Sequence, residues 1–339
     1  MGFLLGFDIG GTKCSICLGV KRGNKMEVID KIKLDTKAPV NEMLETLFLK
    51  AEELIKNNSL SNEDINAIGI SCGGPLNSEE GIILSPPNLP GWDNIPMVAM
   101  VEKRFKTKAL LMNDANACVI AEWKFGAGKG SKNLIFLTFG TGMGAGLVLD
   151  GKLYTGTNGF AGEIGRLRLA EMGPVGFGKS GSFEGFCSGG GIAQLAQIKV
   201  MEKLQMGEKV SFCKSLEELP NLTAKLVADS AYKGDNLAIE IFKICGFYLG
   251  RGLSLLIDII NPEIIVLGSI YGRAIDLLEP SMREVIDQES YHNSNNVCSI
   301  VPAKLGEQIG DIASLSLADR ISLYNETISD EISKKSSIF

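Results

Sequence analysis

The chain has 339 residues, and 45% of them are hydrophobic, which is enough to bury a core in one large domain or in two ordinary ones. Its formal net charge is −6, and the lysines and arginines are scattered along the sequence. The sequence therefore excludes the basic stripe that duplex DNA or an anionic membrane would need, and we expect neither nucleic acid nor membrane as a partner.

The first predicted elements are three strands, over residues 3–9, 14–20 and 25–34. The start of the chain lacks the basic segment and cleavage site of a secretory signal, so we expect a cytoplasmic protein. A helix follows the third strand. Its apolar residues recur with the helical period at Met43, Leu44, Leu47, Phe48, Ala51, Leu54 and Ile55.

The sequence INAIGISCGG then predicts a strand that runs into a glycine turn, and the prolines of LSPPNLPGWDNIP predict a loop. The next strand is short, in KALLMNDAN, and its polar tip begins a helix near Ala115. In NLIFLTFGTGMGAGLVLDG the opening arrangement returns as a strand, a Gly/Thr turn and a second strand. Two similar β-turn-β units about 130 residues apart indicate two related halves.

After Ser188 the chain is predicted to be mostly helical. The apolar stretch from Leu237 to Ile260 is interrupted by charged residues, which favours a buried helix over a membrane span. The sequence NPEIIVLGS predicts one more strand, and LGEQIGDIASLSLADR predicts a helix that packs on the first half.

These elements predict an α/β protein of two lobes with a cleft between them. The smaller N-terminal lobe covers residues 1–115 and is completed by a C-terminal helix at about 305–325. The larger lobe covers 116–304, and a polar tail covers 326–339.

The eight cysteines are too dispersed for a disulfide framework, and their apolar neighbours indicate reduced, packed thiols. Cys14 and Cys17 form the chain's CxxC sequence. On an alternating strand this spacing points the two side chains to opposite faces, so we expect a structural role and not a shared metal ion.

Two glycine-rich turns are candidates for binding phosphate: DIGGTK, from Asp8 to Lys13, and GTGMG, from Gly140 to Gly144. Each exposes backbone N–H groups that no side chain blocks, and the threonine hydroxyls add neutral donors. Taken singly, each turn is also consistent with an ordinary tight hairpin, because glycine is common in turns for steric reasons. Their recurrence in matching contexts favours a polyphosphate site.

The chain resembles the ROK family of sugar kinases and related repressors, within the actin-like, hexokinase-like ATPase superfamily. The motifs that carry the resemblance occur in the family's order and span nearly the whole chain; they are GFDIGGTK, SPPNLPGW, NDANACVIAEWKFGAG, TFGTGMGAGLVLDGKLYTGTNGFAGEIG, NPEIIVLG and LGEQIGDIASLSLA. The resemblance implies a two-lobe, ribonuclease H-like fold with a central cleft.

The resemblance also implies ATP and Mg²⁺ as cofactors, with Asp8 holding the metal through water. The turn at Gly268 would lie near the adenosine, although Ser269 stands where the family usually has a second glycine. The implied phosphate-binding residues are Gly10, Gly11, Thr12, Lys13, Thr141, Gly142 and Gly144.

For the sugar, the resemblance implies Asp114 as the base that takes a proton from the attacking hydroxyl. The residues that match the family's sugar pocket are Gly74, Asn88, Asn113, Glu163 and Glu184. From residue types alone, other roles stay open: a helix cap for Asp114, a turn residue for Asn88, and solvated carboxylates for the two glutamates.

The family's usual zinc ligands, one histidine and three cysteines, are all replaced. Arg166 stands at the histidine position, and Val175, Phe177 and Ser182 stand at the cysteine positions. We therefore expect no structural zinc, and a loop held by packing, with Phe177 and Phe183 as candidates. Arg166 would bind the sugar, pair with Glu163 or Glu184, or point into solvent.

These residues predict an ATP-dependent kinase that acts on a hydroxyl of a hexose or an amino sugar. The alternative is a sugar-binding or regulatory member of the same family without catalysis. A repressor would carry a helix-turn-helix before the first phosphate segment, and seven residues precede Asp8, too few for such a module. A homodimer is consistent with the resemblance, but the sequence reveals neither an interface nor the identity of the sugar.

Overall fold

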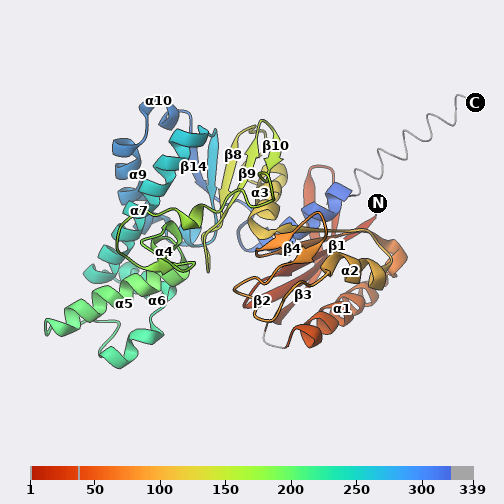
Figure 1. The fold of residues 1–339 in the computed structure, drawn as a ribbon, viewed down its shortest axis with the longest axis horizontal. Helices are drawn as coiled ribbons and strands as arrows, with labels where there is room; N and C mark the ends of the chain where they lie inside the picture. The colour runs from red at the N-terminus through yellow and green to blue at the C-terminus, as the bar shows by residue number, and fades with distance from the viewer. Residues whose placement is uncertain (1, 37–38, 322–339) are drawn as a thin grey trace, which may run out of the picture. The chain divides into compact units, whose positions relative to one another are not determined.

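A computed structural model describes residues 2–36 and 39–321 of the chain. The chain forms two compact units (Figure 1). Unit 1 comprises residues 1–130, 155–160 and 307–339, and unit 2 comprises 131–154 and 161–306. The lobe boundary predicted near residue 115 falls inside unit 1, and the predicted polar tail lies outside the described residues.

Unit 1 is built on a five-stranded sheet in the order β3-β2-β1-β4-β7. Strand β1 pairs antiparallel with β2 and parallel with β4, which in turn pairs parallel with β7. The three strands predicted at the start of the chain are confirmed. The strands are β1 (Phe3–Ile9), β2 (Lys13–Arg22), β3 (Lys25–Asp35), β4 (Ile65–Cys72) and β7 (Ala109–Asn113), with the short pair β5 (Leu76–Asn77) and β6 (Ile82–Ile83) beside them.

Helices α1 (Val40–Asn57) and α2 (Met97–Phe105) share one apolar cluster with side chains of the central strands. The helical period predicted α1, and all seven of its predicted apolar residues are buried. The prediction stopped short of α2, which follows the proline-rich loop and buries Met97, Val101 and Phe105 at a spacing of four residues.

The helix over residues 309–321 packs against the sheet at positions where the strands carry glycine. Side chains added at Gly6 and Gly69 would collide with Ser314, and one added at Gly19 would collide with Leu315. The small residues on both sides let the backbones approach closely. This helix belongs to unit 1, where the sequence predicted a C-terminal helix that packs on the first half.

Two buried aspartates attach this helix to the sheet. Asp311 is 4% exposed and accepts hydrogen bonds from Ser15 Oγ at 2.6 Å and Lys31 Nζ at 2.9 Å. Asp319 is buried as well, and its carboxylate lies 3.0 Å from Lys21 Nζ and 3.5 Å from Lys124 Nζ. Each buried charge is thereby paired, as burial requires.

Replacing Asp311 with alanine should lower the free energy of unfolding by about 2 kcal/mol, because it leaves Ser15 and Lys31 without their buried partner. The exposed Lys225–Asp229 pair supplies the control, and Asp229→Ala should change stability by less than about 0.5 kcal/mol. Urea unfolding of both variants measures the difference. Equal midpoints would show that Asp311 does not hold the helix.

Unit 2 repeats the topology of unit 1 with a second five-stranded sheet, in the order β10-β9-β8-β13-β14. Its first three strands along the chain are antiparallel, and β8, β13 and β14 run parallel, which confirms the prediction of two related halves. Strand β14 was not predicted. The strands are β8 (Leu134–Leu137), β9 (Ala145–Leu149), β10 (Lys152–Tyr154), β13 (Ile264–Leu267) and β14 (Ser299–Pro302).

The longest helix of unit 2, α7, runs from Asn236 to Ile260 and lies in the unit's apolar cluster, which confirms the predicted buried helix. Over residues 2–36 and 39–321, no helix is both long and apolar enough to cross a membrane. The other helices are α4 (Phe183–Phe186), α5 (Gly189–Gln205), α6 (Ala224–Tyr232), α8 (Ile270–Arg273), α9 (Ile275–Glu289) and α10 (His292–Asn295).

All eight cysteines are buried and unpaired, as predicted. Cys14 lies in the cluster with α1, whereas Cys17 contacts the backbone oxygen of Asp311 on the opposite face of the sheet. The predicted divergence of the CxxC pair is confirmed, and burial raises the pKa of both thiols.

Candidate functional site

In unit 1 the parallel strands bring polar residues together at their carboxyl ends. Asp8 on β1 is in register with Ser71 on β4 and Ser15 on β2, and Cys72 is in register with Asn113 at the end of β7. Carboxyl ends of parallel strands are the usual location of ligand sites in α/β proteins.

Asp8 is in an environment that disfavours its charge. Its pKa is raised from 3.8 to about 7, first by burial and then by the negative charge of Asp114, with a smaller contribution from Asp311. The Ser71 hydroxyl and the charge of Lys33 lower the pKa, but by less. The negative charge of Asp114 therefore reaches Asp8, the other carboxylate that the sequence predicted in this site.

Asp114 begins helix α3 (Asp114–Phe125), but it does not serve as the cap. That role belongs to Asn113, whose Oδ1 accepts from the backbone N–H groups of Ala115 and Asn116. Asp114 Oδ1 accepts from Ala115 N at 2.8 Å, which lowers its pKa, whereas burial has the larger effect and raises it. The carboxylate is therefore held at a helix N-terminus without being needed for capping.

The other predicted residues of unit 1 lie around these two. Gly10 N donates to Lys13 O at 3.1 Å across the β1–β2 turn, and Gly11, Thr12 and Lys13 are exposed at its tip. A side chain at Gly11 would collide with the backbone of Asn88, so the proline-rich loop packs on this turn. A Cβ at Gly74 would lie 3.4 Å from Asn113 Nδ2.

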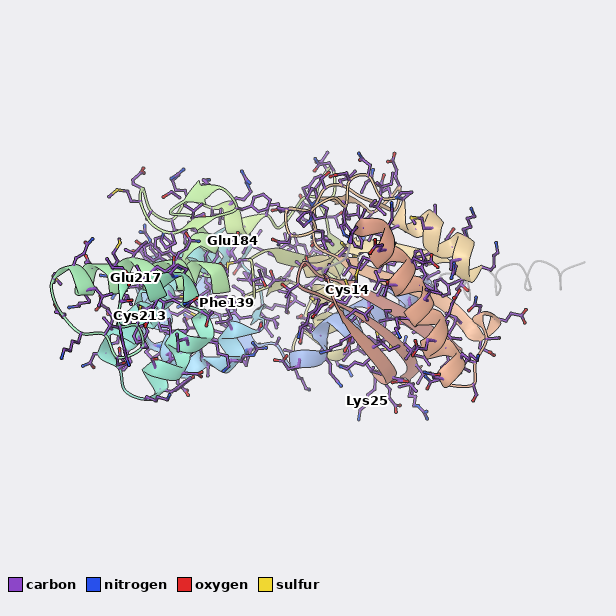
Figure 2. All side chains as sticks on the ribbon, turned by 90° about the horizontal axis from the view of Figure 1, so that it is seen from below. Cys14, Lys25, Phe139, Glu184, Cys213 and Glu217 are labelled. Carbon is purple, nitrogen blue, oxygen red and sulfur yellow. The ribbon has the colours of Figure 1, made fainter. Side chains whose placement is uncertain are left out.

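In unit 2 the predicted phosphate turn joins β8 to β9, and its conformation is fixed by Glu184. Met143 N donates to Glu184 Oε2 at 2.9 Å, and a Cβ at Gly142 would lie 2.8 Å from the same oxygen. Figure 2 labels Glu184 in α4 and Phe139 at the start of the turn. Thr141 is exposed, and Gly144 N donates to Thr138 Oγ1 at 2.8 Å.

The turn after β13 lies beside this phosphate turn, because β8 and β13 are parallel neighbours with Leu137 and Leu267 in register. Gly268 N donates to Leu137 O at 2.9 Å. Ser269 adopts a φ of +40°, a conformation that favours glycine, so the serine at this position strains the backbone.

The segment that contains Glu163 packs on the same turn. A side chain at Gly165 would collide with Met143 O and would also contact Glu184. Glu163 and Arg166 are both exposed, at either end of a short 3₁₀ helix, η2 (Ile164–Arg166). The Arg166 guanidinium lies over the ring of Phe177, 5.1 Å from its centroid.

Oxygen donors around Asp8 suit a hard divalent cation. The Ser71 hydroxyl is buried and has no hydrogen-bond partner of normal geometry among the described residues, although it lies close enough to lower the pKa of Asp8. In the part of the chain that the structure describes, no three His, Cys, Asp or Glu side chains converge as direct ligands.

Sequence reasoning missed two residues near this site, Asp311 and Ser71. A signal for Asp311 existed, because Asp311 and Asp319 interrupt an otherwise apolar and small-residue helix eight residues apart. No comparable signal existed for Ser71, which reads as an ordinary residue of a buried strand.

Known proteins match this chain over nearly its full length. The sequence model described as the ROK family matches residues 4–321. A glucokinase of Thermotoga maritima is 31% identical over 315 residues, which cover 93% of this chain and 96% of that protein. A xylose repressor of Caldicellulosiruptor bescii is 30% identical over 295 residues, covering 86% of this chain and 71% of that protein.

Among solved structures, a ROK family glucokinase from Streptomyces griseus, in complex with glucose and AMPPNP, superposes with a TM-score of 0.75. It is 24% identical, and the match covers 94% of this chain and all of that one. The predicted α/β fold of the actin-like ATPase type is confirmed by this likeness. The chain belongs to the ROK family.

Proposed function

We propose that this protein is a kinase that transfers the γ-phosphoryl group of ATP to a hydroxyl of a hexose or an amino sugar. The observation that carries the proposal is the placement of two carboxylates at the carboxyl ends of parallel strands in one sheet, Asp8 in β1 and Asp114 directly after β7, where the charge of Asp114 raises the pKa of Asp8. A sugar kinase needs one carboxylate for the metal and another for the proton, and Asp8 and Asp114 meet those needs. The likeness to glucokinases, over 93% and 81% of this chain, supports the same assignment.

In this proposal Asp114 accepts the proton of the attacking hydroxyl. Its raised pKa suits that task, because a base works best when its pKa is near the working pH. The α3 N-terminus and the hydrogen bond from Ala115 N favour the ionised form, which is the form that accepts a proton. Asn113 uses Oδ1 for capping, which leaves Nδ2 as a donor for a sugar hydroxyl.

Each unit has one candidate phosphate-binding segment: residues 10–13 in unit 1, and Thr141, Gly142 and Gly144 in unit 2. Gly10 N and Gly144 N donate within their own turns, so the donors to phosphate would be the threonine hydroxyls and the N–H groups beside them, in Gly11–Thr12 and in Thr141–Gly142. Asp8 would hold Mg²⁺ through water, and the ion, when bound, would neutralise negative charge on the phosphates. Glu184 would keep the second segment in its binding conformation.

A coupled ADP-release assay with ATP and Mg²⁺ tests the proposal over a panel of glucose, mannose, fructose, their N-acetylated relatives and xylose. We expect sugar-dependent ADP release with at least one hexose or amino sugar. Release that no sugar increases above the background rate of ATP hydrolysis would contradict the kinase assignment.

A second function, sugar sensing without catalysis, has support from the xylose repressors that match this chain at about the same identity as the glucokinases. Calorimetric titration of the same sugars separates the two functions. A kinase binds its sugar and releases ADP, whereas a sensor binds a sugar tightly and leaves ATP unchanged.

A further inference from the structure

The strained turn of the hairpin β11 (Val175–Gly176) to β12 (Lys179–Ser180) presents an unusual residue. Its two loop residues, Phe177 and Gly178, have φ of +49° and +71°. Such two-residue turns strongly favour Asn-Gly, because positive φ is unfavourable for a bulky side chain. A phenylalanine with positive φ makes this turn conformation less favourable. Its presence therefore indicates that the ring has a role other than forming the turn.

The ring of Phe177 lies under the guanidinium of Arg166, the last residue of η2, in a cation–π arrangement. A second contact joins the hairpin to the same residue: Lys179 Nζ donates to the backbone oxygen of Arg166 at 2.7 Å. Both ends of the hairpin turn are thereby attached to the short helix that begins directly after Glu163.

The hairpin is followed closely in the chain by Glu184, which holds the phosphate turn through Met143 N. Between strand β12 and Glu184, the backbone is held where Phe183 N donates to Leu167 O at 2.8 Å. Ser182 is buried and caps α4 by accepting from Gly185 N. Hydrogen bonds thus hold the chain between the hairpin and Glu184, and the exposed tip of the hairpin contacts Arg166.

We propose that Arg166 and Phe177 are positioning residues, whose stack fixes η2 so that the Glu163 carboxylate is held ready for a sugar hydroxyl. This inference rests on the proposed sugar-binding function of the same site. It assigns Arg166 a role through Phe177 and not a direct contact with the sugar. Loss of the stack should weaken sugar binding while the chemical step and ATP binding remain unchanged.

The test uses four variants of the full chain. Three carry single substitutions, Phe177→Asn, Phe177→Tyr and Arg166→Met, and the fourth combines Arg166→Met with Phe177→Asn. Glucose is the first probe, or the best sugar of the ADP-release panel. Phe177→Asn and Arg166→Met should each raise the KM for the sugar about two- to fivefold, the range expected from an exposed cation–π contact. Their kcat and KM for ATP should stay within about twofold of the parent protein, because neither residue contacts the reacting atoms.

Further comparisons separate positioning from general damage. The double change should be no worse than either single one, since both remove the same contact. Phe177→Tyr should restore the parent KM because it keeps a ring. Val175→Thr is the matched control, since Val175 is 48% exposed in the same hairpin and Phe177 is 47% exposed. Thermal unfolding should show Phe177→Asn to be at least as stable as the parent, because asparagine suits the turn.

Hydrogen exchange of residues 163–169 gives a readout that does not depend on catalysis. The Phe177→Asn and Arg166→Met proteins should exchange faster in this segment without any ligand. If hydrogen exchange rises but no sugar is phosphorylated, the proposed kinase function is contradicted. The role of the Arg166–Phe177 contact in holding residues 163–169 is then still supported. If Arg166→Met alone raises the sugar KM and Phe177→Asn changes neither KM nor exchange, Arg166 contacts the sugar and the inference is overturned.

Discussion

Asp114→Asn should reduce kcat for sugar phosphorylation by about a hundredfold to ten-thousandfold, the range that a general base contributes. The sugar should still bind with about its parent affinity, because asparagine keeps the size of the side chain and an oxygen that can accept from Ala115 N. The cap of α3 is unaffected, since Asn113 provides it. Coupled ADP release measures kcat, and calorimetric titration measures sugar binding.

Asp235→Asn is a matched control for this experiment. Asp235 caps α7 by accepting from Ala238 N, so the change is chemically the same at another helix N-terminus. It should leave kcat within about twofold of the parent value, because asparagine is also a good cap. Turnover of Asp114→Asn as high as that of Asp235→Asn would remove Asp114 from the mechanism.

The strands and turns of the candidate site were predictable because their signals are local. Short, mostly apolar runs mark β1 and β2, and the glycines between them mark the turn, so the turn over residues 8–13 could be placed without any tertiary information. The same pattern around residues 134–149 then indicated the repeat, and the two sheets do share one strand order.

Elements without a local signal were not predicted. Strand β14 has four residues and ends in Pro302, and only its pairing with β13 makes it a strand. The electrostatic environment of Asp8 was not predicted for a related reason. The carboxylate of Asp311, about 300 residues later in the chain, comes near Asp8 through the packing of the helix over 309–321 against glycines of the sheet.

The role of Arg166 shows the limit of a family resemblance. Residue types alone allowed Arg166 a sugar contact, an ion pair or a solvated position. The structure leaves Arg166 exposed and adds a contact with Phe177 that the sequence did not predict. The two residues stand at a histidine and a cysteine position of the family's zinc loop. A contact between Arg166 and Phe177 cannot be predicted from either residue alone, because it depends on both side chains and on how the chain brings them together.

Asp8→Asn should abolish phosphorylation and at the same time stabilise the metal-free protein. Burial and the charge of Asp114 disfavour the ionised form of Asp8 in the folded state, and asparagine carries no charge to bury. A pKa raised from 3.8 to about 7 corresponds to about 4 kcal/mol. Because the side chain is partly accessible to water, we expect a gain of about 2 kcal/mol in the free energy of unfolding.

The gain should depend on pH with a defined sign. Below about pH 4, Asp8 is protonated in both the folded and the unfolded chain, so the substitution should change stability little. Between about pH 4 and pH 7 the unfolded chain binds fewer protons than the folded one, so the parent protein loses stability as the pH rises. The advantage of Asp8→Asn should therefore grow through this window and be complete above about pH 7.

Urea unfolding in EDTA at pH 4, 6 and 8 measures the effect, with the exposed Asp93→Asn as the control that should show no such trend. Adding Mg²⁺ and ATP should then stabilise the parent protein and not the Asp8→Asn variant, because a ligand stabilises the state that binds it. An Asp8→Asn protein that is less stable than the parent at pH 8 would mean that ionised Asp8 is satisfied by its neighbours. A structural charge, and not a carboxylate kept available for a cation, would then be the correct description of Asp8.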